Sequence, residues 1–493
     1  MTFNSLQFLV FFPVVAALYY ATAHRFRWML LLAASSYFYM AFVPKYIIIL
    51  FFLIAVDYCA GIAIERAPER YKRFCLIASI IANLGTLFIF KYFNFFNDIA
   101  RGLADILRFH YSFRSISILL PIGLSFHVFQ SLSYVIEVYR GRQKAERHLG
   151  IYALYVMFFP QLVAGPIERP QHLIHQFRAT HQFDATAITQ GLQMMLWGFF
   201  KKLVIADSLA ILVDHVYGNI ALSSGLTIAI AVVLFSYQLY CDFSGYSDIA
   251  VGSAAVLGFS LVQNFNRPYA ARSIAEFWRR WHISLSDWLR DYVYYPLAKK
   301  LSRHRRTGVY ASILITFVLI GLWHGANWTF VMLGVIHGVY MVLAHASKTL
   351  RDQWTRISGL MRFSRIRGAI QVIATFFLVS MSWIFFRAPS IGDAVRIIQR
   401  MVSGAGYIPL AAFLHTNSTF QSLLGITRAR LAIVLVSIVI MEIIQYAFIR
   451  PSWLRAWHAR SPWVRMGLWY ALIFWILVFG NFSAGTFIYF QFR

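Results

Sequence analysis

The stretch that decides the fold is residues 309–346, VYASILITFVLIGLWHGANWTFVMLGVIHGVYMVLAHA, which contains no Lys, Arg, Asp or Glu. An α-helix rises 1.5 Å per residue, so about 20 apolar residues cross a hydrocarbon core about 30 Å thick. These 38 residues are too many for one ordinary span and barely enough for two. Because Gly321, Gly325 and Asn327 cluster around His324, we expect a break or a tight re-entrant turn there.

The composition of the whole chain is that of a membrane protein. Apolar residues make up 59% and charged residues 13%, against roughly 45–50% and 25% in soluble domains. Mean hydropathy is +0.62, and apolar runs of spanning length recur along the sequence. The runs are continuous rather than alternating, which favours helices over a β-barrel. We predict an all-α polytopic membrane protein with about 11–13 transmembrane or re-entrant helices.

Positive charge is concentrated between the apolar runs. The net charge is +26. The basic clusters lie at residues 65–73, 140–147, 299–306, 348–367 and 387–400. This distribution is typical of cytoplasmic loops under the positive-inside rule, so the bilayer is the predicted partner and nucleic acid is not.

Two aspartates interrupt an apolar run. Asp242 and Asp248 lie within residues 226–261. A carboxylate is costly inside a membrane, so both are expected to face protein or a water-filled cavity. The chain has three cysteines, no C-x-x-C pair and no carboxylate cluster with metal-ligand spacing, so no metal site is predicted.

Residues 276–297, EFWRRWHISLSDWLRDYVYYPL, have the periodicity of an amphipathic helix. At 100° per residue, Trp281 and His282 fall on the apolar face, whereas Arg279 and Arg290 fall on the polar one. We therefore expect a helix that carries His282 on its apolar side. An imidazole there needs a hydrogen-bond partner. An interfacial helix with a purely structural histidine is the alternative interpretation.

His324 lies deep within an apolar run. If its helix begins at Tyr310, His324 lies about 21 Å along it, near or beyond the membrane midplane. Ionisable groups at that depth are candidates for function, and His282 is the predicted partner. His337 lies about 220° further round an unbroken helix and is expected to be structural. A neutral imidazole in an aromatic-lined cavity suits deprotonation of a hydroxyl, but a proton relay or pore residue stays open.

Several short motifs occur in order along the chain. They are Phe3–Phe8, Pro121–Phe126, Ala164–Arg169, Asp242–Asp248, Asn264–Tyr269, Phe277–His282 and Gly321–Trp328. With these motifs the sequence resembles the membrane-bound O-acyltransferase (MBOAT) family, in the bacterial branch of alginate O-acetyltransferases. The resemblance covers nearly the whole chain.

The resemblance implies a ring of helices around a thin centre, with a cytoplasmic funnel for the acyl donor. It implies a single membrane domain over residues 1–493, with a catalytic core at approximately 116–346 and additional C-terminal helices at approximately 369–493. In the family's pattern His324 is the essential catalytic residue, and His282 occupies the second active-site position.

The leading hypothesis is an O-acyltransferase that moves an acetyl group from a cytosolic thioester, such as acetyl-CoA, across the bacterial inner membrane. The product would be an O-acetylated exported polysaccharide such as alginate. His324 would act as general base. His282, with Trp281, Trp323 and Asn327 as substrate-binding residues, would orient the carbonyl or stabilise its oxyanion. No bound cofactor is expected.

Resembling systems use a periplasmic SGNH esterase-like protein to complete the transfer, so a separate partner is implied here. The direct acceptor would be either that partner or the polysaccharide. Peptidoglycan O-acetylation and D-alanyl transfer to teichoic acid are alternatives within the family, although the chain is long for the second. A proton-coupled transporter is the alternative from another class, but the sequence has no paired halves with matching broken helices.

Overall fold

The computed structural model describes the chain except residues 118–119, 164, 359–361, 405–416, 449–454, 456–458, 483–486 and 489–493. Ala164, the first residue of the Ala164–Arg169 motif, therefore lies outside the described residues. The described residues form helices and no β-strand, so the predicted all-α class is confirmed. They fold into two compact units. The first contains Met1–Met195 and Tyr246–Gln263, and the second contains Leu196–Gly245 and Asn264–Ile488.

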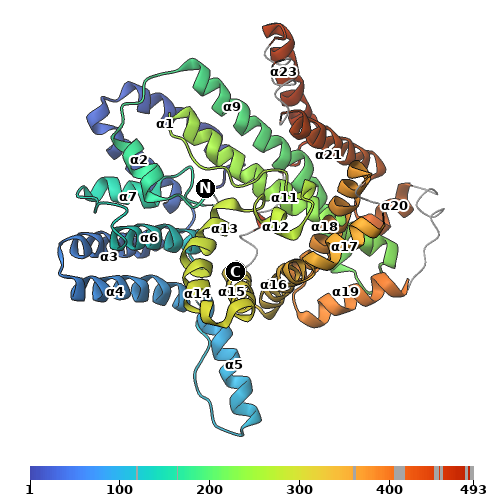
Figure 1. Cartoon of the computed structure of the whole chain (residues 1–493). Coiled ribbons are helices and arrows are strands. Elements are labelled where there is room, and N and C mark those ends of the chain that lie inside the picture. The colour runs from blue at the N-terminus through green and yellow to red at the C-terminus, as the bar shows by residue number, and fades with distance from the viewer. Residues whose placement is uncertain are drawn as a thin grey trace. The chain divides into compact units, whose positions relative to one another are not determined.

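In the first unit, α3, α4 and α6 lie side by side (Figure 1). Ser5 is the N-cap of α1 (Leu6–Ala21), since its hydroxyl accepts a hydrogen bond from the Phe8 N–H. The helices are α1 (Leu6–Ala21), α2 (His24–Met40), α3 (Ile47–Arg66), α4 (Glu69–Leu87), α5 (Phe93–Ile106), α6 (Leu124–Tyr139), α7 (Leu149–Met157), α8 (Pro170–Leu173) and most of α9 (Ala185–Phe199). This unit also has two 3₁₀-helices, η1 (Pro44–Tyr46) and η3 (Ile174–Arg178), and a π-helical segment, η2 (Phe88–Tyr92), between α4 and α5.

The second unit contains the helices around the predicted histidines. They are α10 (Asp207–Gly218), most of α11 (Gly225–Val256), α12 (Ile274–Trp278), α13 (Ile283–Leu289), α14 (Tyr295–Lys300), α15 (Arg305–His324), α16 (Trp328–Ala346), α17 (Lys348–Ile357), α18 (Ser364–Arg387), α19 (Ile391–Ser403), α20 (Asn417–Leu424), α21 (Arg428–Phe448) and α23 (Pro462–Phe479). Two π-helical segments, η4 (Phe200–Ala206) and η6 (Arg290–Tyr294), and two 3₁₀-helices, η5 (Pro268–Ala270) and η7 (Ser302–His304), also belong to this unit.

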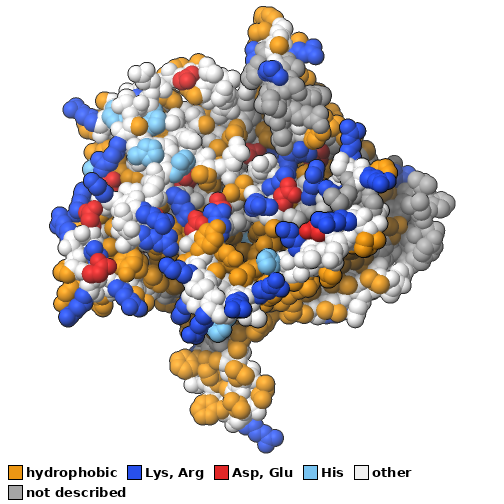
Figure 2. Space-filling view, in the orientation of Figure 1, with side chains coloured by type: hydrophobic (Ala, Val, Ile, Leu, Met, Phe, Trp, Pro, Cys, Tyr) orange, Lys and Arg blue, Asp and Glu red, His pale blue; other side chains and the backbone are white. Residues whose placement is uncertain are grey.

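Eight helical segments among the described residues are long and apolar enough to cross a membrane. They are Pro44–Arg66, Glu69–Ile106, Gly225–Val256, Ser302–His324, Trp328–Ala346, Ser364–Arg387, Arg428–Ala447 and Pro462–Phe479. The predicted 11–13 segments also included shorter apolar runs, of which α1 is one. Large apolar side chains such as Ile48, Ile81 and Ile373 are exposed on these spans. Hydrophobic side chains also cover α5 (Figure 2). A chain with this much exposed apolar surface is suited to contact with lipid.

The break expected around His324 is confirmed. Helix α15 ends at His324 and α16 begins at Trp328. The Asn327 side chain caps α16 by accepting a hydrogen bond from the Thr329 N–H at 3.0 Å. Residues 309–346 therefore form parts of two helices joined by a three-residue turn.

Glycines let these two helices approach closely. A Cβ added at Gly321 would lie 2.1 Å from the Phe330 carbonyl oxygen, and one at Gly334 would lie 2.3 Å from the Phe317 oxygen. Both obstacles are backbone atoms, which cannot move aside as a side chain can. The small residues therefore set the spacing of α15 and α16, and with it the position of His324 at the end of α15.

The single helix predicted for residues 276–297 is wrong. Helix α12 ends at Trp278 and α13 begins at Ile283. Between them His282 adopts φ +44° and ψ +56°, a left-handed conformation that costs a non-glycine residue about 1–3 kcal/mol. His282 is thus the N-cap residue of α13 rather than a member of a helix face.

Backbone hydrogen bonds from a distant segment explain this break. The Ile283 N–H donates to the Asn264 carbonyl at 2.9 Å, and the Asn266 N–H donates to the Arg280 carbonyl at 2.9 Å. These bonds take the place of helical ones for the Arg280 carbonyl and the Ile283 N–H. Helical periodicity describes only local spacing, so it could not reveal a competing partner from residues 264–266.

We expect Gly321→Ala to destabilise the protein by about 1–3 kcal/mol, because the new methyl group collides with backbone of α16. The matched control is Gly467→Ala in α23, where an added Cβ has no atom within 4 Å. The measurement is the midpoint of thermal unfolding in detergent micelles. Equal midpoints for the two variants would show that close α15–α16 packing is not needed.

Candidate active site

Three of the predicted site residues meet in the second unit. The Trp323 ring lies 5.5 Å from the His282 ring and 5.1 Å from the His324 ring, measured between centroids. His282 is 0% exposed, while His324 and Trp323 are each 4% exposed. The indole of Trp323 therefore joins two buried imidazoles in one cluster. We refer to His282, Trp323 and His324 as the histidine cluster.

Aromatic rings from two other helices complete the surroundings of the histidine cluster. Phe243 of α11 lies 4.7 Å from His282 in an edge-to-face arrangement, and Phe386 of α18 lies 5.4 Å from His324. Burial lowers the pKa of His282, which lies between the spanning segments, to about 3. His282 is therefore a neutral imidazole near neutral pH, as a base or a hydrogen-bond acceptor must be.

Trp281 and Asn327 occupy different positions from the histidine cluster. Trp281 is 1% exposed, and its ring packs against Phe265 at 5.2 Å and Trp383 at 5.1 Å. Its indole N–H has no hydrogen-bond acceptor among the described residues. The Asn327 amide caps α16 and also donates to the Pro389 carbonyl at 3.1 Å. Asn327 therefore holds the turn that follows His324.

His337 contrasts with the histidine cluster. It is 1% exposed, and its Nδ1 accepts a hydrogen bond from the Trp278 indole N–H at 3.2 Å. Its Nε2 lies 2.9 Å from the Ser382 hydroxyl, which in turn donates to the Val379 carbonyl. Both ring nitrogens thus have partners inside the core, which is the arrangement of a structural histidine.

Asn264 contacts His282 but received no role from the sequence. Its side-chain oxygen lies 3.2 Å from His282 Nδ1, and the residue is 2% exposed. The sequence marks Asn264 only as the first residue of the Asn264–Tyr269 motif. Its proximity to His282 depends on the break between α12 and α13, which the periodicity does not reveal.

A buried ion cluster anchors α11 beside the histidine cluster. Lys202 Nζ lies 2.6 Å from Asp242 and 2.8 Å from Asp207, and the three side chains are 1–6% exposed. Lys202 lies in η4, a π-helical turn of a kind that is often found near functional sites. Asp242 immediately precedes Phe243, which contacts His282. The expectation that Asp242 faces protein is confirmed, but its partner Lys202 was not predicted.

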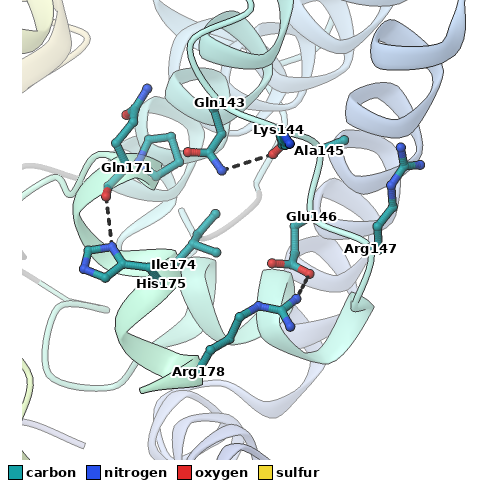
Figure 3. Close-up of a pocket in the computed structure, with 10 residues that line it drawn as sticks. Gln143, Lys144, Ala145, Glu146, Arg147, Gln171, Ile174, His175 and Arg178 are labelled. Carbon is teal, nitrogen blue, oxygen red and sulfur yellow. Dashed lines mark hydrogen bonds and ion pairs between the residues drawn. The ribbon is translucent and has the colours of Figure 1, made fainter. Parts of the chain in front are cut away.

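The first unit contains an open basic pocket of about 270 Å³. It is lined by Gln143, Lys144, Ala145, Glu146, Arg147, Pro170, Gln171, Ile174, His175 and Arg178. Arg178 points to and pairs with Glu146, while His175 donates to the Gln171 carbonyl (Figure 3). The basic cluster at residues 140–147 indicated this charge, but not that the chain forms a hollow there. Among the residues that the structure describes, no group of three His, Cys, Asp or Glu side chains could hold a metal.

Comparison with known proteins defines the class. The model of MBOAT, the membrane-bound O-acyltransferase family, matches residues 147–388. That range includes both imidazoles of the histidine cluster and the buried ion cluster. The spanning helices and the family match together define a multi-pass membrane acyltransferase.

Relatives of known name extend this match over most of the chain. The probable alginate O-acetylase of Pseudomonas aeruginosa is 38% identical, over 82% of this chain and 75% of its own length. The corresponding protein of Azotobacter vinelandii is 39% identical, over 82% and 78%. The peptidoglycan O-acetyltransferase of Helicobacter pylori is 32% identical, over 78% and 75%. The chain belongs to the membrane-bound O-acyltransferase family, and it is an O-acyltransferase.

We expect Lys202→Met to destabilise the protein by about 3–5 kcal/mol, because it leaves two buried carboxylates without their counter-ion. The matched control is Lys72→Met, which removes a surface pair with Glu69 and should change stability by less than about 1 kcal/mol. Both are measured as unfolding midpoints in detergent. If Lys72→Met lowered the unfolding midpoint as much as Lys202→Met, the buried cluster would not contribute more to stability than a surface ion pair.

Proposed function

We propose that this chain transfers an acetyl group from a cytosolic thioester, such as acetyl-CoA, for O-acetylation of an exported polysaccharide such as alginate. The inner membrane is the proposed location. Identity of 38–39% to probable alginate O-acetylases supports the polysaccharide acceptor. The observation that carries the chemistry is the histidine cluster, in which two buried imidazoles contact one indole.

In the proposed reaction His324 is the general base. It takes the proton of the acceptor hydroxyl while the hydroxyl oxygen attacks the carbonyl carbon of the thioester. The carbon–sulfur bond then breaks, and the leaving thiolate receives the proton from the His324 imidazolium. The surrounding rings exclude water, which would otherwise compete as an acceptor. The sequence has no G-x-S-x-G nucleophile motif, so in this proposal acetyl transfer is direct, without an acetylated enzyme side chain.

The other predicted residues support this step. His282 forms a hydrogen bond to the reacting molecules. The Trp281 indole N–H is a donor for the carbonyl oxygen, which becomes negative as the bond forms. Asn327 holds the turn after His324, and Trp323 separates the two imidazoles. We place the catalytic core at residues 116–346 of a single domain spanning 1–493.

A separate periplasmic protein of the SGNH esterase-like type is the proposed partner. The resemblance to alginate O-acetylation systems supports it, since such a partner passes the acetyl group to the polymer there. The direct acceptor of this chain is then a hydroxyl of the partner or of the polysaccharide. Incubation of the purified chain with labelled acetyl-CoA and one candidate acceptor at a time distinguishes the two, because only the direct acceptor gains label.

We expect His324→Ala to reduce acetylation of the polymer by at least about 100-fold, because the base is lost. The protein should still insert and purify as the unchanged chain does. The readout is acetate released from the exported polymer by mild alkali. His110→Ala is the control, since His110 is exposed in the first unit and should leave the acetate content unchanged. Normal acetylation by His324→Ala would overturn the proposed role.

A second candidate acceptor is peptidoglycan. The 32% identity to a peptidoglycan O-acetyltransferase supports it. The same alkali assay on isolated cell walls and on exported polysaccharide separates the two, because acetate should appear on only one polymer. D-alanyl transfer to teichoic acid would instead release alanine in that assay.

An assay in proteoliposomes distinguishes an acyltransferase from a transporter. With acetyl-CoA on the cytoplasmic side, we expect consumption of the thioester that depends on a hydroxyl acceptor, because acyl transfer breaks the carbon–sulfur bond. Free thiol and acetylated acceptor are measured together. Movement of an intact solute with no thioester consumed would contradict acyltransferase activity and favour the proton-coupled transporter.

A further inference from the structure

The orientation of the Asn264 amide is determined by its neighbours. The Asn264 side-chain oxygen accepts from the Ser284 N–H at 3.1 Å and from the Ser284 hydroxyl at 2.8 Å. If the amide were turned over, its NH₂ group would face the Ser284 N–H, and two donors would meet. A backbone N–H cannot reverse its role. The atom 3.2 Å from His282 Nδ1 is therefore the amide oxygen.

The amide oxygen in turn determines the tautomer of His282. A carbonyl oxygen only accepts, so His282 Nδ1 must carry the hydrogen and donate it. In a neutral imidazole the other nitrogen then has a lone pair. His282 Nε2 is consequently a hydrogen-bond acceptor in the resting protein.

Asn264 also holds the backbone on which His282 sits. Its carbonyl accepts from the Ile283 N–H, and its side chain accepts from the next amide, that of Ser284. These two N–H groups belong to the first turn of α13, where helical partners are lacking. One residue thus caps α13 and stabilises the left-handed conformation of His282.

We infer that Asn264 is a positioning residue that locks His282 in the Nδ1–H tautomer, so that Nε2 accepts a hydrogen bond from a hydroxyl of the acyl acceptor. The inference rests on the proposed acetyl transfer. A thioester carbonyl oxygen and its oxyanion only accept hydrogen bonds, so a lone pair at Nε2 cannot stabilise them. This excludes the oxyanion role expected for His282 from the sequence and assigns His282 to the side of the acceptor, while His324 takes the proton of the reacting hydroxyl.

Two substitutions test whether Asn264 orients His282 or only stabilises the fold. Asn264→Leu keeps the approximate volume and removes the acceptor, so kcat should fall about 10- to 100-fold, as for other residues that orient an active-site histidine. Asn264→Asp keeps an acceptor for Nδ1–H and should retain most of the rate. Its carboxylate favours the charged imidazolium and so raises the pKa of His282. The acid limb of the pH–rate profile should therefore move to higher pH in Asn264→Asp.

Three contacts of the His282 ring involve groups that do not ionise. They are Phe243 of α11, Trp323 of α15 and the Asn264 amide. A shift of the acid limb relative to the unchanged chain is attributed to the new carboxylate, because the other contacts of the ring are the same in both proteins. The matched controls are Asn97→Leu and Asn97→Asp, which change another buried asparagine, in the first unit. Neither control should move the acid limb.

A direct measurement tests the tautomer without an activity assay. The protein is labelled with ¹⁵N-histidine, and the His282 signals are identified by subtracting the spectrum of His282→Gln. We expect a protonated Nδ1 and an unprotonated Nε2 in the unchanged chain, and loss of this preference in Asn264→Leu. If Asn264→Leu does not fold, the spectra of the unchanged chain and of Asn264→Asp still decide the question.

The outcomes are distinguishable. A protonated Nε2 in the resting protein would overturn the inference, as would an Asn264→Leu variant with the rate and pH profile of the unchanged chain. Failure of the unchanged chain to transfer acetyl groups would instead overturn the proposed function. In that case the tautomer signal would still report on Asn264.

Discussion

Polar side chains buried among apolar helices must find partners within the protein, because lipid offers none. Two well-defined cases find their partners in different ways. Lys202 pairs with Asp207 and Asp242. The Asp57 carboxylate accepts from the Ser79 hydroxyl at 2.6 Å and from the Asn83 amide. In each case at least one partner comes from another helix, Asp242 of α11 for Lys202 and two residues of α4 for Asp57, so burial of polar groups ties the helices of a unit together.

The same requirement distinguishes the histidines from one another. His337 has a partner on each ring nitrogen, Trp278 and Ser382, and these partners belong to the core. His282 donates a hydrogen bond from Nδ1 to Asn264, which leaves Nε2 as a hydrogen-bond acceptor. His324 ends its helix, and a glycine and an alanine follow it before Asn327 caps the next. His282 and His324 thus lie at a helix break and a helix end, whereas His337 lies inside α16 and is held by hydrogen bonds on both ring nitrogens.

The local features of the site could be predicted to different degrees. The turn after His324 was predicted from Gly321, Gly325 and Asn327, since these residues favour breaks wherever they occur. The amphipathic pattern of residues 276–297 is real, but its implied continuous helix is interrupted at residues 279–282. A periodicity cannot detect that residues 264–266 compete for the same backbone groups. The role of Asn264 was missed for the same reason.

The sequence by itself determined that this chain crosses a membrane as helices, that a turn follows His324, and that ordered motifs connect it to the acyltransferase family. These conclusions depend on composition, on neighbouring residues and on spacing, all of which are local. Only the tertiary structure decided that Trp323 contacts both imidazoles, that Lys202 neutralises Asp242, and that Asn264 determines the tautomer of His282. Except for that between the neighbours Trp323 and His324, those contacts join residues separated in the chain, and their geometry exists only once the buried polar groups have been paired.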